Sequence, residues 1–124
     1  MATKLKPQAV FALPARLVID VRLCSTGLHL TLRGEIDVHT APQLRDRLAE
    51  VLGQGEERVV VHLDGVTFMD STALGVLVGA HKAQAATGGS FELVCTEPRL
   101  LRILTLTGLH RVFTVHDGVD GGSA

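Results

Sequence analysis

Aromatic residues are scarce in this chain of 124 residues, which has four Phe and neither Trp nor Tyr. Its core must therefore be built from Leu, Val, Ile and Ala, which suits a sheet covered by helices. The scarcity also argues against a site for single-stranded nucleic acid, because such sites stack bases on aromatic rings. Excess positive charge is missing too, since 12 basic residues stand against 13 acidic ones. A general nucleic-acid binder is thereby excluded, because such binding depends on clustered Lys and Arg.

Long apolar runs are also missing, since none approaches the roughly 20 residues that cross a bilayer as a helix. The one stretch that resembles a secretion signal is residues 9–13, which follows two lysines. Pro7 and Pro14 bound it, and it is shorter than the apolar region of a signal peptide. We therefore expect residues 1–16 to form an extended N-terminal arm, and we expect the protein to be cytoplasmic.

Cysteine is rare as well, with Cys24 and Cys95 as the two present. Neither belongs to a Cys-x-x-Cys pair, so the sequence has no zinc or redox motif of that type. Both lie beside apolar stretches, and we interpret them as buried free thiols in a reducing cytoplasm. A disulfide between them is the alternative.

Two segments in which apolar and polar residues alternate come first, at 17–23 and 28–32, on either side of a Ser-Thr-Gly turn. This period of two predicts a β-hairpin with one buried face. A helix is expected next, with Thr40 and Gln43 as a capping box at its start and Gly53 at its end.

The rest of the chain alternates between strand and helix patterns. The apolar run at 59–63 predicts a central strand, followed by a turn at Asp64-Gly65. The elements expected after it are a helix over 72–86, a strand over 91–95, a helix that Thr96 opens and Gly108 stops, and a strand over 112–115. This β-β-α-β-α-β-α-β order predicts one α/β domain over residues 17–117, with a mixed, mostly parallel sheet and covering helices. Residues 118–124 are expected to form a flexible tail.

The stretch from Phe68 to Gly75 lies where the central strand gives way to a helix. Ser71 is therefore expected at or near the helix N-cap, where unpaired backbone N–H groups and the positive end of the helix dipole meet. A phosphate on the Ser71 hydroxyl would meet those donors without breaking the helix. On position alone the alternative is a plain capping serine, because Ser, Thr and Asp are the usual N-cap residues.

The residues from Asp70 to Leu77, Asp-Ser-Thr-Ala-Leu-Gly-Val-Leu, resemble the D-S-[ST]-G-L-G signature of the STAS-domain anti-sigma factor antagonists. Three other stretches resemble the family in order and spacing: Gly34-Glu35-Ile36-Asp37 with Thr40-Ala41-Pro42, the run from Val60 to Val66, and Leu106-Thr107-Gly108-Leu109 with Phe113. The resemblance covers about residues 17–117, and it implies a single STAS domain.

In that family the serine after the aspartate is phosphorylated by the partner anti-sigma factor, a serine kinase. By position this serine is Ser71, with Thr72 as the alternative acceptor. Ala73 stands where the family has glycine, which would matter if the position needed a positive φ or a close backbone approach. The surface that the resemblance implies for partner binding comprises Asp37, Asp70, Ser71, Thr72, Ala73 and Gly75.

Asp37 and the pair Gly75 and Gly79 have competing interpretations. The resemblance implies that Asp37 lies near the phosphoacceptor, whereas a residue of this type can equally cap a turn. Gly75 and Gly79 lie about one helical turn apart. We expect these glycines to let the helix sit close to the sheet rather than to mark a binding face.

Motifs of the common enzyme classes are missing. Ser71 is not part of a G-x-S-x-G nucleophile elbow, the six histidines form no H-E-x-x-H motif, and there is no P-loop. A phospho-receiver is disfavoured because Lys82, the one lysine after the N-terminal segment, lies inside a predicted helix. We expect no catalysis, no metal and no other cofactor, and instead a substrate of a serine kinase and a serine phosphatase.

The resemblance implies control of transcription in a bacterium through protein partners, without direct contact to nucleic acid and without membrane insertion. The unphosphorylated protein would bind an anti-sigma factor of the GHKL serine-kinase type and so release a sigma factor. Phosphorylation of Ser71 would end that binding, because it adds about -1.5 to -2 charges beside Asp70, and a serine phosphatase would restore it. The alternative is a STAS scaffold or transporter-associated subunit that works without phosphate.

Overall fold

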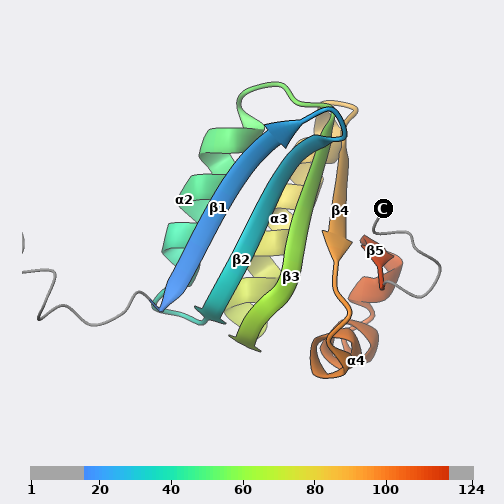
Figure 1. Ribbon diagram of the computed structural model, residues 1–124. Helices are drawn as coiled ribbons and strands as arrows, with labels where there is room; N and C mark the ends of the chain where they lie inside the picture. Colours follow the sequence, from blue (N-terminus) through green and yellow to red (C-terminus); the bar gives the residue numbers. More distant parts are fainter. Residues whose placement is uncertain (1–15, 118–124) are drawn as a thin grey trace, which may run out of the picture.

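The computed structural model describes residues 16–117, which fold around a five-stranded sheet (Figure 1). The strands lie across the sheet in chain order: β1 (Leu17–Cys24), β2 (Gly27–Ile36), β3 (Arg58–Met69), β4 (Ser90–Val94) and β5 (Thr114–His116). The helices are α2 (Ala41–Leu52), α3 (Ser71–Ala86), α4 (Pro98–Leu106) and the short 3-10 helix η1 (Leu109–Arg111). This succession confirms the predicted α/β order. The expected tail and all of the expected arm except Arg16 lie outside the described residues.

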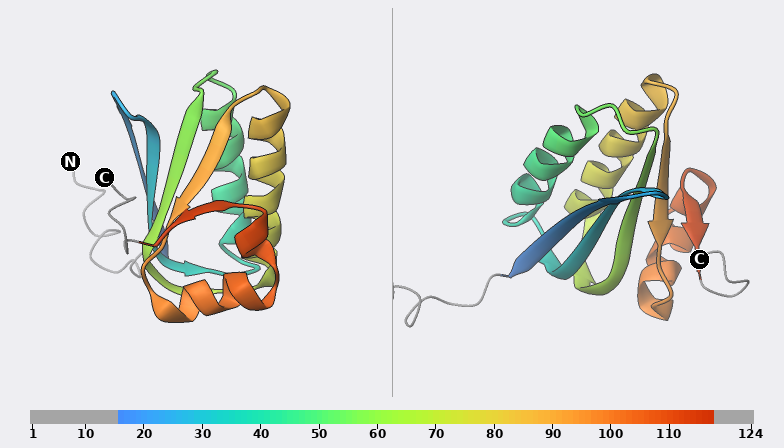
Figure 2. Two further views of the ribbon diagram at one scale, coloured as in Figure 1. Left: turned by 90° about the vertical axis from the view of Figure 1, so that its right-hand side faces the viewer. Right: turned by 45° about the horizontal axis from the view of Figure 1, so that its top comes forward.

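The sheet is mixed, as predicted. β1 and β2 form the antiparallel hairpin, and the pairs from β2 to β5 are all parallel. Helices α2 and α3 lie side by side on one face of the sheet, whereas α4 lies beyond the end of β4 (Figures 1 and 2). The parallel strands therefore run toward one common edge, and loops from several elements meet there.

Leucine and valine fill the space between the sheet and helices α2 and α3. On β2, Leu28, Leu30 and Leu32 are at most 2% exposed, and they alternate with the less buried His29 and Thr31. This alternation is the predicted period of two, with one face of the hairpin buried in the core. Leu44 and Leu48 of α2 and Leu77 of α3 complete the same core, together with side chains of β3 and β4.

The turn predicted at Asp64-Gly65 is wrong, because β3 continues through both residues to Met69. The register between β2 and β3 shifts twice along this stretch, which marks irregular, bulge-like pairing rather than a turn. Gly65 is needed for the close pairing, since a Cβ there would lie 2.6 Å from Cγ of Arg33. The extra length of β3 brings its end level with the end of β2.

The predicted capping box of α2 is wrong as well. The Thr40 hydroxyl points away from the helix, donating to the Glu35 carbonyl (2.8 Å) and accepting the Asp37 N–H (2.9 Å). Gln43 donates to the Leu17 carbonyl across 3.2 Å instead of reaching back to Thr40. The Asp37 carboxylate accepts the Thr40 N–H (3.0 Å), so the turn before α2 is organised by an aspartate rather than by the threonine.

The start of α4 also differs from the prediction. Glu97 caps this helix by accepting the N–H of Arg99 at 2.8 Å. Thr96 donates its N–H (2.6 Å) and its hydroxyl (3.0 Å) to Asp64. Thr96 therefore ties the β4–α4 connection to β3 and does not open the helix.

Both cysteines are free, so the disulfide alternative is excluded. Cys95 is buried, as predicted, and burial raises the pKa of its thiol to about 11. Cys24 is exposed, which corrects the expectation of a buried thiol there. It ends β1 at the hairpin turn, where the side chain leaves the core. Within residues 16–117, no helix is both long and apolar enough to cross a membrane.

Candidate functional site

The candidate site lies at the edge of the sheet where β2 and β3 both end. Ile36 and Met69 are paired as the last residues of their strands, and the N–H of Asp70 donates to the Ile36 carbonyl at 3.3 Å. Asp37 and Asp70 therefore leave neighbouring parallel strands at the same edge. The two aspartates can flank one site only if β2 and β3 end at the same edge of the sheet, and the structure meets this condition.

Asp70 is the N-cap of α3. One oxygen of its carboxylate accepts the N–H groups of Thr72 (3.0 Å) and Ala73 (3.1 Å). The strand ends in extended backbone at Asp70, so the carboxylate can turn back over the first helical turn. Ser71 thus lies next to the cap and not at it, as the first residue of the helix.

The Ser71 side chain is exposed, and its hydroxyl has no hydrogen-bond partner within residues 16–117. A phosphate on Ser71 was expected to meet unpaired N–H groups at the helix start. The Asp70 carboxylate already accepts those of Thr72 and Ala73. A phosphate on Ser71 would therefore share the positive end of the helix with a carboxylate. Two negative groups would lie on adjacent residues at this edge.

Asp37 caps the turn before α2. Its Oδ1 atom accepts the N–H groups of His39 (2.9 Å) and Thr40 (3.0 Å), and its other oxygen pairs with Arg16. Partial burial acts to raise the pKa of Asp37, but these hydrogen bonds outweigh it and hold the pKa below its usual value. Asp37 thus fits both of its interpretations, since it caps a turn and also lies at the edge where Asp70 leaves β3.

Arg16 also belongs to the candidate site, although the sequence did not predict it there. Its guanidinium donates to Glu35 at 2.9 Å and to Asp37, so it neutralises part of the charge at the end of β2. The contacts join residues about 20 positions apart. The sequence predicted the hairpin but not its register, and this register places Arg16 opposite Glu35.

Ala73 occupies its position without strain, although the family signature has glycine there. It is fully buried in an ordinary helical turn, and among residues 16–117 every residue with positive φ is a glycine. Its methyl group packs into the core, so the position needs no special backbone conformation. The departure from the signature leaves the geometry around Ser71 intact.

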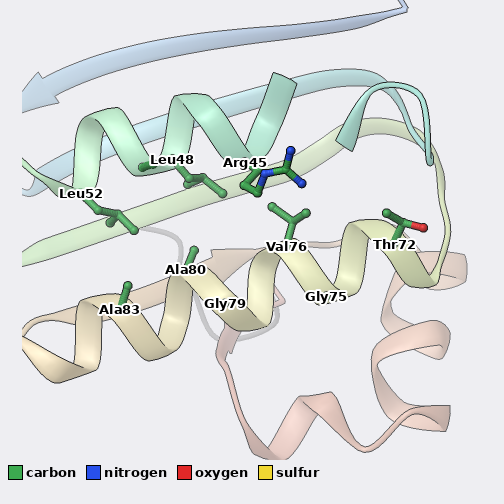
Figure 3. A pocket seen from close by; sticks show the side chains of 10 residues that line it. Arg45, Leu48, Leu52, Thr72, Gly75, Val76, Gly79, Ala80 and Ala83 are labelled. Carbon is green, nitrogen blue, oxygen red and sulfur yellow. The ribbon is translucent and has the colours of Figure 1, made fainter. Parts of the chain in front are cut away.

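The expectation for Gly75 and Gly79 is wrong. Both glycines are exposed, and a Cβ built on either would meet no heavy atom within 4 Å apart from its chain neighbours and the backbone of its own helix. They line a groove of about 410 Å³ between α2 and α3, together with residues such as Leu48 and Val76 (Figure 3). Other α3 residues, including Leu77, face the core instead.

Residues 16–117 contain no group of three or more His, Cys, Asp or Glu side chains able to hold a metal ion. The closest pair of histidines is His29 and His62 on the other face of the sheet, with Nδ1 and Nε2 2.8 Å apart. Sequence reasoning treated the histidines as scattered and missed this pair, which depends on the pairing of β2 with β3.

Comparison with known proteins agrees with this fold. The model of the STAS domain family matches residues 18–122. The anti-sigma-B factor antagonist of Bacillus subtilis (strain 168) is 36% identical over 104 residues, which cover 84% of this chain and 94% of that protein. An anti-sigma factor antagonist from Mycobacterium paratuberculosis has a crystal structure with a TM-score of 0.78 at 26% identity, covering 89% of this chain and 93% of the other.

A further solved structure is the Bacillus cell fate determinant SpoIIAA in its phosphorylated form. It gives a TM-score of 0.63 at 21% identity, over 79% of this chain and 90% of that one. At this identity the likeness concerns the fold alone. The match of the family model across most of the chain and the identity to the Bacillus subtilis relative go further. The chain therefore belongs to the STAS domain family, and the relatives named above from Bacillus subtilis and Mycobacterium paratuberculosis are anti-sigma factor antagonists.

Proposed function

We propose that this protein is an anti-sigma factor antagonist that is switched off by phosphorylation of Ser71. The observation that carries the proposal is the state of the Ser71 side chain. It is exposed on the first residue of α3, and its hydroxyl is unengaged within the described residues 16–117. A kinase can reach such a hydroxyl without first breaking a hydrogen bond of the fold.

The switch acts through charge at the shared edge of β2 and β3. Phosphorylation adds about -1.5 to -2 charges at neutral pH, on the residue next to the Asp70 carboxylate. The first helical N–H groups already serve Asp70, so the chain itself offers the phosphate few free donors. A partner surface packed over this edge would have to desolvate the added charge, which costs several kcal/mol unless cations match it.

The partner that fits this cycle is an anti-sigma factor with GHKL-type serine-kinase activity in the bacterial cytoplasm. The unphosphorylated surface around Asp37, Asp70, Ser71, Thr72, Ala73 and Gly75 binds the kinase, and a sigma factor is released. After phosphate transfer the complex separates, and a serine phosphatase resets the protein. The name of the Bacillus subtilis relative, an anti-sigma-B factor antagonist, supports this class of partner.

Phosphate transfer tests the proposal. Each GHKL-type anti-sigma kinase of the source bacterium is purified and incubated with the full chain and labelled ATP. Wild type and Thr72→Ala incorporate label with at least one kinase, whereas Ser71→Ala incorporates none. Label that persists on Ser71→Ala and disappears on Thr72→Ala would move the acceptor to Thr72.

A phosphate-independent STAS scaffold or transporter-associated subunit predicts a different result. In that case a partner binds the chain tightly, but no kinase of the panel transfers phosphate to it. Wild type that binds a partner and stays unlabelled would therefore reject the switch and favour the scaffold.

A further inference from the structure

A groove between α2 and α3 is open to the surface. Its side walls are apolar, with Leu48 and Leu52 extending from α2 and Val76 and Ala80 from α3 (Figure 3). The groove has a volume of about 410 Å³, enough for at least one large side chain. Apolar hollows of this kind on a protein surface are typical binding places for a complementary side chain.

The side of the groove formed by α3 lacks side chains at Gly75 and Gly79. Gly75 and Gly79 are one helical turn apart on α3, and neither would bring a Cβ within 4 Å of another group. Neither glycine has positive φ, so the helix does not require glycine at these positions. Glycine in a helix interior is less stable than alanine by roughly 1 kcal/mol. Neither packing nor backbone conformation accounts for the two glycines, whereas the open groove does.

We propose that this groove receives one large apolar side chain of the anti-sigma factor, and that Arg45 pairs with a carboxylate beside it. The proposal rests on the function proposed above and adds a second contact region, lined by both helices, to the surface around Ser71.

The groove is continuous with the surface proposed for the kinase. The groove begins at Thr72 and Gly75, which belong to the surface proposed for the kinase, and it runs along α3 to Ala83. A partner that covers Ser71 therefore meets the open end of the groove. A side chain inserted there would gain apolar burial close to the phosphoacceptor.

Charge favours the same occupant. Arg45 lies at the groove, its side chain is 62% exposed, and its carboxylate contact within residues 16–117 is a distant one to Asp46 at 4.0 Å. The guanidinium is thus available to a carboxylate of the partner, and an apolar residue next to an acidic one matches both features.

Filling the groove tests the proposal. Affinity for the purified GHKL-type kinase that labels wild type is measured by calorimetry for Gly79→Leu, Gly79→Ala and wild type. We expect Gly79→Leu to weaken binding by about tenfold or more, because its side chain occupies the groove. Gly79→Ala leaves the affinity within about twofold, since it changes helix propensity but barely fills the space. Arg45→Glu weakens binding too, and more strongly at low salt.

Ala85→Leu is the matched control, because Ala85 is exposed on α3 outside the groove. Its affinity stays at the wild-type value, and thermal melts show that all variants are folded. Equal affinity of Gly79→Leu and wild type overturns the groove contact. A second result would also overturn the groove contact: wild type self-associates, and Gly79→Leu loses this self-association but keeps its affinity for the kinase. The occupant of the groove would then be a second copy of the chain.

The two proposals fail differently. If Ser71→Glu weakens kinase binding and Gly79→Leu does not, the groove contact is wrong and the phosphate switch stands. If no kinase of the panel binds wild type, the proposed function fails and the groove contact fails with it.

Discussion

Asp70 and Ser71 divide two roles between adjacent side chains at the start of α3. The Asp70 carboxylate caps the helix through the N–H groups of Thr72 and Ala73, and the Ser71 hydroxyl is left exposed. Because the roles are separate, phosphate on Ser71 can change the surface charge while the helix start stays intact.

The first prediction concerns the stability of that helix start. Asp70→Ala should lower the free energy of unfolding by about 1 kcal/mol, the usual effect of losing an N-cap. Ser71→Ala should change it by less than about half of that, because Ser71 donates and accepts no capping bond. Urea denaturation of the two variants measures both values. If Ser71→Ala lowered the free energy of unfolding more than Asp70→Ala does, Asp70 would not be the N-cap.

Negative charge at position 71 should affect binding more than folding. A carboxylate in the first helical turn is favourable by roughly 0.3–1 kcal/mol, so Ser71→Asp and Ser71→Glu should melt close to wild type. In the complex the same charge must be desolvated next to Asp70, so affinity for the kinase should fall. The effect should be partial, because a carboxylate carries less charge than phosphate. Unchanged affinity with an unchanged melting temperature would count against a charge switch.

Acid should weaken the fold through Glu92. Two hydrogen bonds from Arg58 at 2.9 Å, aided by His116 and Ser90 against the opposing effect of burial, lower the pKa of Glu92 from its usual 4.5 to about 2. The unfolded chain therefore binds this proton more readily. The stabilisation, on the order of 3 kcal/mol, is complete above pH 4.5 and is lost as the pH falls toward 2.

Unfolding experiments at pH 7 and pH 3 can isolate this group. Glu92→Gln should be less stable than wild type at pH 7, and the gap should narrow at pH 3. Glu50→Gln serves as the control, since Glu50 is exposed and, within residues 16–117, paired only with Arg47 of its own helix. Parallel pH profiles for wild type and Glu92→Gln would show that Glu92 is not the responsible carboxylate.

The His29–His62 pair should add a second pH dependence at milder acidity. Their nitrogens are 2.8 Å apart, so one ring donates and the other accepts, and two imidazolium ions cannot share this contact. Burial and Arg58 lower the pKa of His29, and burial and His29 lower that of His62. The stabilisation is therefore present above about pH 6.5 and declines below it. Histidine titration by NMR should give both pKa values below the usual 6.5, and values at or above 6.5 would refute the pairing.

Local patterns in the sequence were sufficient for most of the fold. The alternation around Leu28 and Leu30 depends only on neighbouring residues, so it predicted the hairpin and its buried face correctly. The turn predicted at Asp64-Gly65 was wrong, because pairing of β3 with β2 overrides the local preference of these two residues for a turn. The prediction that Gly75 and Gly79 face the sheet was wrong. Helix α3 carries apolar residues on several sides, so the sequence did not reveal which side meets the sheet.

The site was predictable only where motifs were continuous in sequence. Asp70 and Ser71 are adjacent, and the strand-to-helix change placed them near a helix start. The contact of Arg16 with Asp37 and the opposition of His29 to His62 join distant segments. The first contact depends on the register of the antiparallel β1–β2 hairpin, and the second depends on the register of the parallel β2–β3 pair. Alternation alone does not determine either register.

The affinity of the anti-sigma kinase for the chain before and after phosphorylation tests the central claim most directly. The full chain is phosphorylated by the kinase that labels it, its modification at Ser71 is verified by mass spectrometry, and both forms are titrated calorimetrically into that kinase. The charge switch predicts that the phosphorylated form binds at least about tenfold more weakly, a difference of roughly 1.4 kcal/mol, while both forms melt at nearly the same temperature. Equal affinity of the two forms would contradict it.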